Sequence, residues 1–161
     1  MDNPSTQSSS QTFIELSGQT LAKVALLGVG LGLVSWLLTM LIRQVVFVPL
    51  FCGDPANAAC VGATGSAGVL ALIVTGIIGL LGLVRLGVYR PLLVALAAAI
   101  SLWGMSLWIG SMQWYEALAW SIVLYALTYV LYTWLVRPRA FGFALGAVLV
   151  AVVLSRIVIA L

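Results

Sequence analysis

The stretch LAKVALLGVGLGLVSWLLTMLI, residues 21–42, decides the class of fold. Its single charged residue is Lys23, and its length suffices to cross a hydrocarbon core of about 30 Å at about 1.5 Å of helix rise per residue. The apolar core of a cleaved signal sequence is shorter, and a small-x-small cleavage pattern occurs only far past the run, at Ala56-Asn57-Ala58. We therefore predict an uncleaved first membrane helix. Cleavage, the alternative, would leave one helix fewer.

Four further apolar runs follow along the chain. Charged residues make up only 7% of the sequence, against about 25% in a soluble domain, which is too few to give a globule a solvated surface. We therefore predict an all-α membrane protein, a polytopic bundle of five transmembrane helices, or four if the first is cleaved. The spans are expected at about 21–42, 66–84, 91–111, 115–136 and 140–160.

The segments outside the spans differ in composition. Residues 1–20 begin with MDNPSTQSSSQT, which has too little apolar content to order itself, so we expect a flexible cytoplasmic tail and an interfacial lead-in. Residues 44–65 are rich in Gly, Pro, Asp and Asn, which is typical of turns, and are expected to form an exterior loop. The transmembrane domain is then 21–161.

Basic residues near the ends of the runs predict the orientation. Cytoplasmic loops of membrane proteins carry an excess of Lys and Arg. Five basic residues fall on one side of the predicted bundle, namely Lys23, Arg85, Arg90, Arg137 and Arg139. Only two, Arg43 and Arg156, fall toward the other side. We therefore expect a multi-pass protein of the cell membrane, inner or plasma, with a cytoplasmic N-terminus and an exterior C-terminus.

Small residues recur at helical spacing in several of the spans. They include Gly28, Gly32, Gly68, Gly79, Gly82, Gly142 and Gly146. Lipid provides no hydrophobic drive between helices, so close packing in a membrane uses small residues. Packing within the bundle is the commoner explanation for any one such face. The alternative is a docking face for other integral membrane subunits, because one small bundle is not expected to bury all of these faces.

The run 115–136 carries three tyrosines on one helical face. Tyr125, Tyr129 and Tyr132 stand at i, i+4 and i+7. Packing against a neighbouring helix is the first interpretation. A contact with another subunit, or with a bound lipid or quinone, is the alternative.

Three charges are expected in the outer part of the bundle, at Arg43, Glu116 and Arg156. Arg156 follows Arg139 by about 25 Å of helix rise, which places it in the outer part of the last span. Ionisable groups inside a membrane mark functional sites by default and have a partner. We predict Glu116 as the partner of Arg156. The alternatives are outer lipid headgroups and the C-terminal carboxylate.

Cys52 and Cys60 are the only cysteines, and both fall in the predicted exterior loop. In an oxidising compartment we expect them to form a structural disulfide. The alternative is a thiol–disulfide relay, but membrane oxidoreductases of that kind carry a C-x-x-C motif and a second cysteine pair, which this sequence lacks.

The sequence offers little for catalysis. It contains no histidine and no phosphate-binding loop, and its four carboxylates are scattered. We therefore expect no metal, no cofactor and no self-contained active site. No basic cluster with interleaved aromatic residues predicts nucleic-acid binding. The predicted function is a non-catalytic accessory or structural subunit that packs against other membrane subunits, for example in an electron-transfer complex. A small oligomeric transporter or channel and a redox protein using Cys52 and Cys60 are the alternatives.

Overall fold

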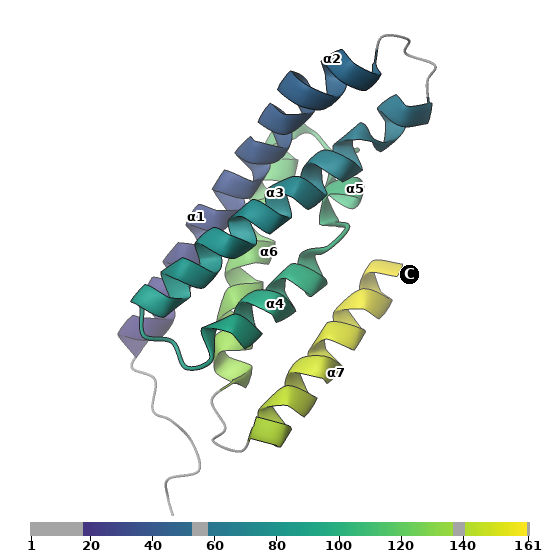
Figure 1. Cartoon of the computed structure of the whole chain (residues 1–161). Coiled ribbons are helices and arrows are strands. Elements are labelled where there is room, and N and C mark those ends of the chain that lie inside the picture. The colour runs from purple at the N-terminus through teal and green to yellow at the C-terminus, as the bar shows by residue number, and fades with distance from the viewer. Residues whose placement is uncertain (1–17, 53–57, 137–140, 161) are drawn as a thin grey trace, which may run out of the picture.

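The computed structural model describes residues 18–52, 58–136 and 141–160. All of the regular secondary structure in these ranges is helical, which confirms the all-α class (Figure 1). The predicted tail lies almost wholly outside the described residues, as do Arg137 and Arg139.

Three helical stretches are long and apolar enough to cross a membrane. They are Gly18–Leu50, Gly62–Arg85 and Trp114–Leu135. The first combines α1 (Gly18–Ile42), a π-helical turn η1 (Arg43–Phe47) and α2 (Val48–Phe51), and the other two belong to α3 (Ala58–Arg85) and α6 (Trp114–Leu135). These helices are compatible with a multi-pass membrane protein. Two further apolar stretches, Pro91–Leu102 and Gly142–Ile157, are shorter than a full span.

The prediction of an exterior loop over 44–65 is wrong for most of its described residues. Helix continues from α1 through η1 into α2, and α3 already begins at Ala58. Pro49 lies just after the π-helical turn η1, so the proline falls where the continuous helix already departs from regular α-helical geometry. Only residues 53–57 of this segment lie outside the described part of the chain.

The predicted continuous helix over 91–111 is also wrong, because the structure divides it into α4 (Pro91–Leu102) and α5 (Met105–Ile109). At the break, Trp103 is extended, with φ −62° and ψ 125°, and Gly104 has φ +89°. A positive φ is readily adopted by glycine, which has no Cβ. Gly104 therefore permits a change of direction inside an otherwise apolar helical run.

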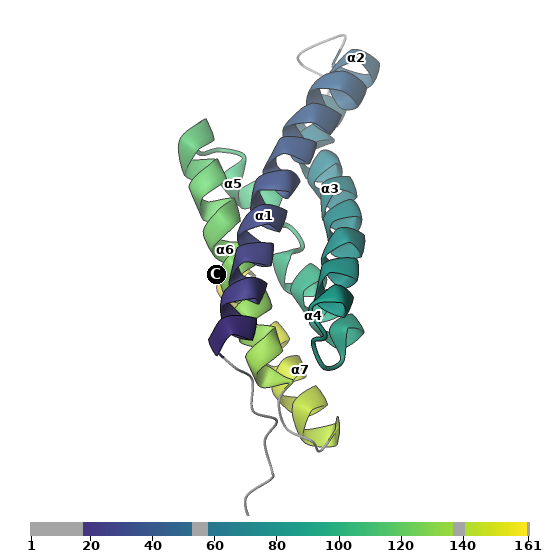
Figure 2. The ribbon, with the colours of Figure 1, turned by 90° about the vertical axis from the view of Figure 1, so that its left-hand side faces the viewer.

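The helices form a bundle in which α1 lies between α6 and α3 (Figure 2). The fragment α4 packs on α3 and α6. The last helix, α7 (Phe141–Ala160), lies at the edge of the bundle, against α4 and to a smaller extent α6 (Figure 1). Both α4 and α7 start at the end of the molecule where α1 begins, and they run in the same direction.

Glycines allow the closest of these approaches, between α1 and α6. A Cβ atom on Gly28 would lie 2.7 Å from Ala126 Cα, and one on Gly32 would lie 2.7 Å from Ile122 Cα. Since backbone atoms occupy these positions, only glycine fits. Gly28 and Gly32 thus serve packing within the bundle.

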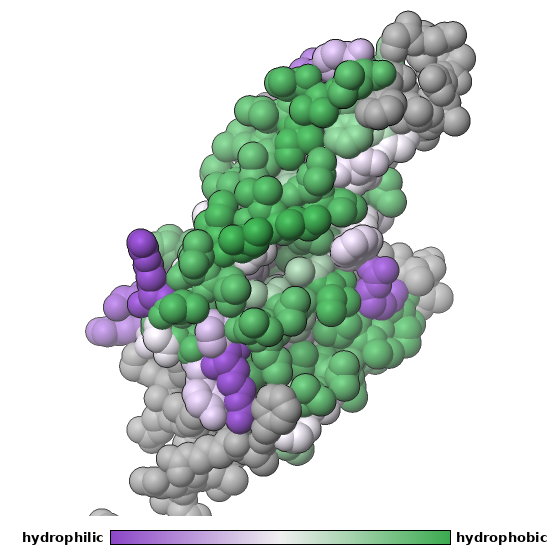
Figure 3. Space-filling view, in the orientation of Figure 1, coloured by the Kyte–Doolittle hydropathy of each residue, from purple (hydrophilic) through white to green (hydrophobic). Residues whose placement is uncertain are grey.

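The outer surface is dominated by apolar side chains (Figure 3). Large aliphatic residues are exposed on every long helix, for example Leu26 on α1, Ile77 on α3 and Leu127 on α6. Such a surface suits hydrocarbon rather than water. In Figure 3 hydrophilic side chains gather at the end where α3 passes into α4.

Candidate functional site

The three tyrosines of α6 all face the interior of the bundle. Tyr125 is 2% exposed, and Tyr129 and Tyr132 are each 1% exposed. Their rings therefore pack against neighbouring helices of the same chain and offer no outer face to a second subunit. Any small molecule that contacts them has to enter the bundle.

The hydroxyl of Tyr125 joins three helices. It donates to Ser35 Oγ of α1 at 2.9 Å and lies 3.2 Å from Thr75 Oγ1 of α3. Thr75 also donates to the carbonyl of Ala71 at 2.8 Å, and both side chains are buried. Hydrogen bonds of this kind between helices stabilise membrane bundles by about 0.6 kcal/mol on average.

A second hydroxyl cluster joins α4, α6 and α7. Ser101 Oγ lies 2.5 Å from the hydroxyl of Tyr132, and Ser155 donates to Ser101 Oγ at 3.2 Å. This cluster provides α7 with a polar attachment to the rest of the bundle.

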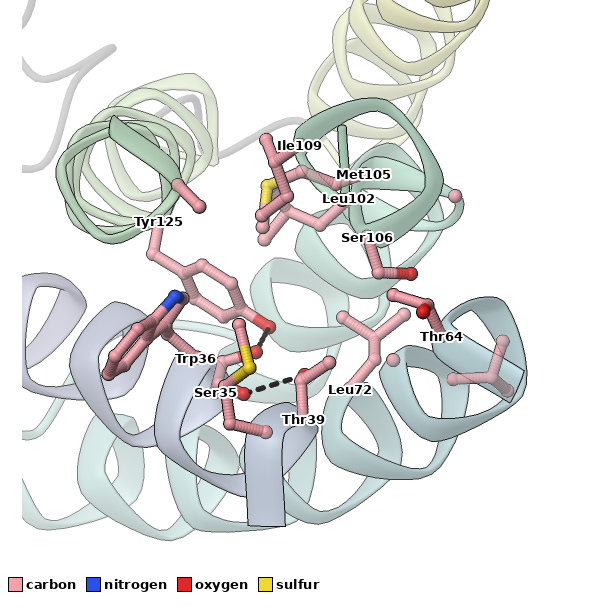
Figure 4. A pocket seen from close by; sticks show the side chains of 16 residues that line it. Ser35, Trp36, Thr39, Thr64, Leu72, Leu102, Met105, Ser106, Ile109 and Tyr125 are labelled. Atoms are coloured by element: carbon pink, nitrogen blue, oxygen red, sulfur yellow. Dashed lines mark hydrogen bonds between the residues drawn. The ribbon is translucent and has the colours of Figure 1, made fainter. Parts of the chain in front are cut away.

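A cavity of about 50 Å³ lies beside the break between α4 and α5 (Figure 4). Its walls come from α1, α3, the end of α4, α5 and α6, and are mostly apolar. The polar side chains among them are Ser35, Thr39, Thr64, Ser106 and Tyr125. A cavity of this size with several hydroxyl groups has room for a few water molecules.

The break leaves a backbone carbonyl that the helix does not use. In an unbroken helix the carbonyl of Trp103 would accept a hydrogen bond from the N–H of Leu107. Here this N–H donates to the carbonyl of Gly104 instead, at 3.1 Å. Arg156 of α7 donates from Nη1 to the Trp103 carbonyl at 2.6 Å. Within a membrane, non-helical backbone is tolerated where other groups of the protein satisfy it. The hydrogen bond from Arg156 of α7 therefore satisfies the Trp103 carbonyl and stabilises the break between α4 and α5.

This arrangement differs from the predicted pairing of Arg156 with Glu116. Among the described residues Arg156 bonds to the Trp103 carbonyl, and no ion pair joins it to Glu116. Glu116 lies in the first turn of α6, where its side chain is exposed. A carboxylate at a helix N-terminus is favoured by the helix dipole without an arginine. Arg43 is exposed in the η1 turn.

The remaining glycines of the sequence prediction fall into two groups. Those of α3 lie against other helices: a Cβ on Gly68 would meet the Ser106 side chain, one on Gly79 the Tyr129 hydroxyl, and one on Gly82 the Leu27 side chain. Those of α7 are open, because no atom of the described residues lies within 4 Å of a Cβ built on Gly142 or Gly146.

Cys52 is the C-cap residue directly after α2, and its thiol is not free in this structure. The side chain of Cys60 lies outside the described residues, so the pairing of the two cysteines stays a prediction.

The chain matches no protein-family model, no curated protein and no solved structure. Its function is therefore argued from its own residues. Among these, the sequence prediction missed the break at Trp103–Gly104 and the role of Arg156 in stabilising it. A glycine within an apolar run was the only signal, and single glycines are tolerated in helices.

We expect replacement of Arg156 by leucine to loosen the break without unfolding the bundle. The variant loses a hydrogen bond from a charged donor, about 1.5–3 kcal/mol. It also removes a charge, whose cost is about 2.5–3.5 kcal/mol at the centre of a membrane helix and smaller at Arg156 near the end of α7, so this gain offsets the lost hydrogen bond only in part. Hydrogen exchange measured by mass spectrometry should become faster at residues 103–107.

Arg156→Lys is the matched control, because it keeps a charged donor and should retain part of the protection. Unchanged exchange at residues 103–107 in Arg156→Leu would show that the break does not depend on this side chain.

Proposed function

We propose that this chain is a non-catalytic integral membrane subunit that uses α7 to dock on a transmembrane helix of another membrane protein. The observation that carries the proposal is the open small-residue face of α7. Gly142 and Gly146 form a G-x-x-x-G pattern, and within the described part of the chain nothing lies within 4 Å of a Cβ built on either. Faces of this type allow two helix backbones to approach closely in lipid.

The other small faces of the bundle support this interpretation by contrast. Gly28 and Gly32 of α1 lie against the backbone of α6, and Gly79 of α3 lies against Tyr129. Close helix packing within this chain thus occurs at glycines of α1 and α3. On α7 the proposed partner helix comes from another molecule.

The position of α7 makes such a contact accessible. It is the outermost helix, and its fully buried described residues are Ala144 and Val148, which face the bundle. The exposed side chains of Val150, Val153 and Ile157 extend the glycine face along the helix. A partner helix would therefore meet a continuous apolar surface.

The proposed setting is the cell membrane with the N-terminus in the cytoplasm. Lys23, Arg85 and Arg90 are near the end of the bundle where α1 and α4 begin, which the excess of basic residues on cytoplasmic sides assigns to the interior of the cell. The helix α7 would then run from the cytoplasmic side outward.

Extraction of the chain from its native membrane in mild detergent tests the docking face. We expect the wild type to co-purify with a stoichiometric membrane protein, and the double variant Gly142→Leu/Gly146→Leu to retain it at least about tenfold less, because side chains added to a close-packed contact cost about 1–3 kcal/mol. Native mass measurement gives the stoichiometry.

Gly30→Leu is the matched control. Gly30 is exposed on α1, and nothing lies within 4 Å of a Cβ built there, so this variant should keep the partner. A wild-type chain that purifies alone, or a double variant that keeps its partner, would contradict the proposal.

A second function is favoured by the broken helix. Discontinuous helices with nearby polar groups form the substrate sites of many transporters. Here the α4–α5 break borders a cavity that contains the hydroxyls of Thr64, Ser106 and Tyr125. A purified homo-oligomer that carries a small polar solute across liposome membranes would support transport in place of the accessory role.

A further inference from the structure

An apolar groove of about 550 Å³ lies between α4 and α7 on the outside of the bundle. Aliphatic side chains of both helices form its walls. They include Leu93, Leu96 and Ile100 from α4, and Leu145, Leu149 and Val152 from α7. Neither Gly142 nor Gly146 lines the groove, which borders the proposed docking face along α7.

The groove has one charged residue in its walls, Arg90, which precedes the first turn of α4. The guanidinium lies 4.6 Å from the centre of the Tyr89 ring, and Nη2 donates to the Tyr89 hydroxyl at 3.3 Å. Tyrosine is enriched where a membrane meets water, since its ring is apolar and its hydroxyl is polar. The basic end of the groove thus has the character of a headgroup region.

The backbone of Arg90 holds an unfavourable conformation. Its φ of +56° is the one positive value among non-glycine residues of the described ranges. For an ordinary L-residue the left-handed region costs about 1–2 kcal/mol, and such strain often accompanies functional sites. The backbone therefore turns at Arg90, beside the groove, in a conformation that costs free energy.

The length of the groove suits one leaflet of a bilayer. The 12 residues of α4 rise about 18 Å from Arg90 to the break. Half of a hydrocarbon core of about 30 Å is about 15 Å. A lipid with its headgroup at Arg90 would place its acyl chain along the whole groove.

We propose that this groove binds an anionic phospholipid. The acyl chain lies against the aliphatic side chains of α4 and α7, and the phosphate meets Arg90. Charge complementarity selects the headgroup, because Arg90 is the one charged residue among the described residues of the groove walls and its positive charge favours an anionic over a zwitterionic headgroup. The positive end of the α4 dipole points to the same place and adds to this preference.

Native mass spectrometry of the purified full chain tests the site, with phosphatidylglycerol and phosphatidylcholine of identical acyl chains as probes. We expect preferential retention of phosphatidylglycerol. Arg90→Gln should reduce this retention about fivefold, the factor that corresponds to about 1 kcal/mol for one basic residue at a membrane surface.

Two further variants separate the groove from general surface charge. Arg85→Gln removes the same charge from the end of α3, outside the groove walls, and should leave the preference unchanged. Leu149→Trp, at an exposed position of α7, should fill the groove and lower the retention of both lipids.

Equal retention of the two lipids by the wild type would overturn the proposal, as would an equal loss in Arg85→Gln and Arg90→Gln. Binding that Leu149→Trp leaves intact would place the lipid elsewhere. These results are independent of whether α7 docks on another protein, since the test uses the purified chain and Gly142 and Gly146 are not among the residues that line the groove.

Discussion

Gly32→Leu is expected to separate α1 from α6 and to destabilise the bundle by about 3 kcal/mol or more. Overpacking a well-packed contact costs about 1–3 kcal/mol, and more where the neighbour cannot move. Here a Cβ atom would lie 2.7 Å from both Ile122 Cα and the Ser121 carbonyl oxygen, which are backbone atoms of α6. Titration with SDS, followed by tryptophan fluorescence, measures the loss of stability.

Gly30→Leu serves as the control for this prediction too. It makes the same substitution two residues away on α1, at an exposed position. Leucine favours a helix over glycine by up to about 1 kcal/mol, so the control should be neutral or more stable. Similar SDS midpoints for the two variants would show that α1 and α6 are not in close contact at Gly32.

Tyr125→Ala is expected to have the second large effect, a loss of about 3–5 kcal/mol. Removing a large buried aromatic side chain costs this much, because apolar contacts are lost and a cavity remains. Tyr125 is 2% exposed and its hydroxyl connects Ser35 of α1 with Thr75 of α3. Its truncation therefore affects three helices at once.

Tyr125→Phe separates packing from hydrogen bonding in the same SDS titration. It keeps the ring and should cost only about 1 kcal/mol, because hydrogen bonds between membrane helices average about 0.6 kcal/mol. Tyr115→Ala, at an exposed position near the start of α6, should have little effect. Equal losses for Tyr125→Ala and Tyr115→Ala would contradict the buried position of Tyr125.

Residue patterns were sufficient to predict the all-α class and the three long apolar helices. The run 21–42 is apolar over about the thickness of a hydrocarbon core, and the same property recurs in 66–84 and 115–136. The tyrosine face also follows from local spacing, since i, i+4 and i+7 share one side of any helix. These inferences need only the geometry of a single helix.

Other features were mispredicted because local composition does not decide them. Glycine and proline in 44–65 indicated turns, yet Pro49 lies just after a π-helical turn in a helix that continues from α1 into α2. Gly104 breaks a helix, while Gly28 and Gly32 do not. At Gly28 and Gly32 the backbone of α6 lies where a Cβ would be, so these glycines permit close packing. Gly104 instead takes a positive φ, and the helix is interrupted there.

The amino-acid sequence by itself determined that this chain is helical and apolar, because helix periodicity and a shortage of charge are local properties. Only the tertiary structure decided which helices meet, that Arg156 bonds to the Trp103 carbonyl, and that the α7 glycines remain open. The physical reason is that these contacts join residues far apart in the chain, and the choice of partner depends on the packing of the whole bundle.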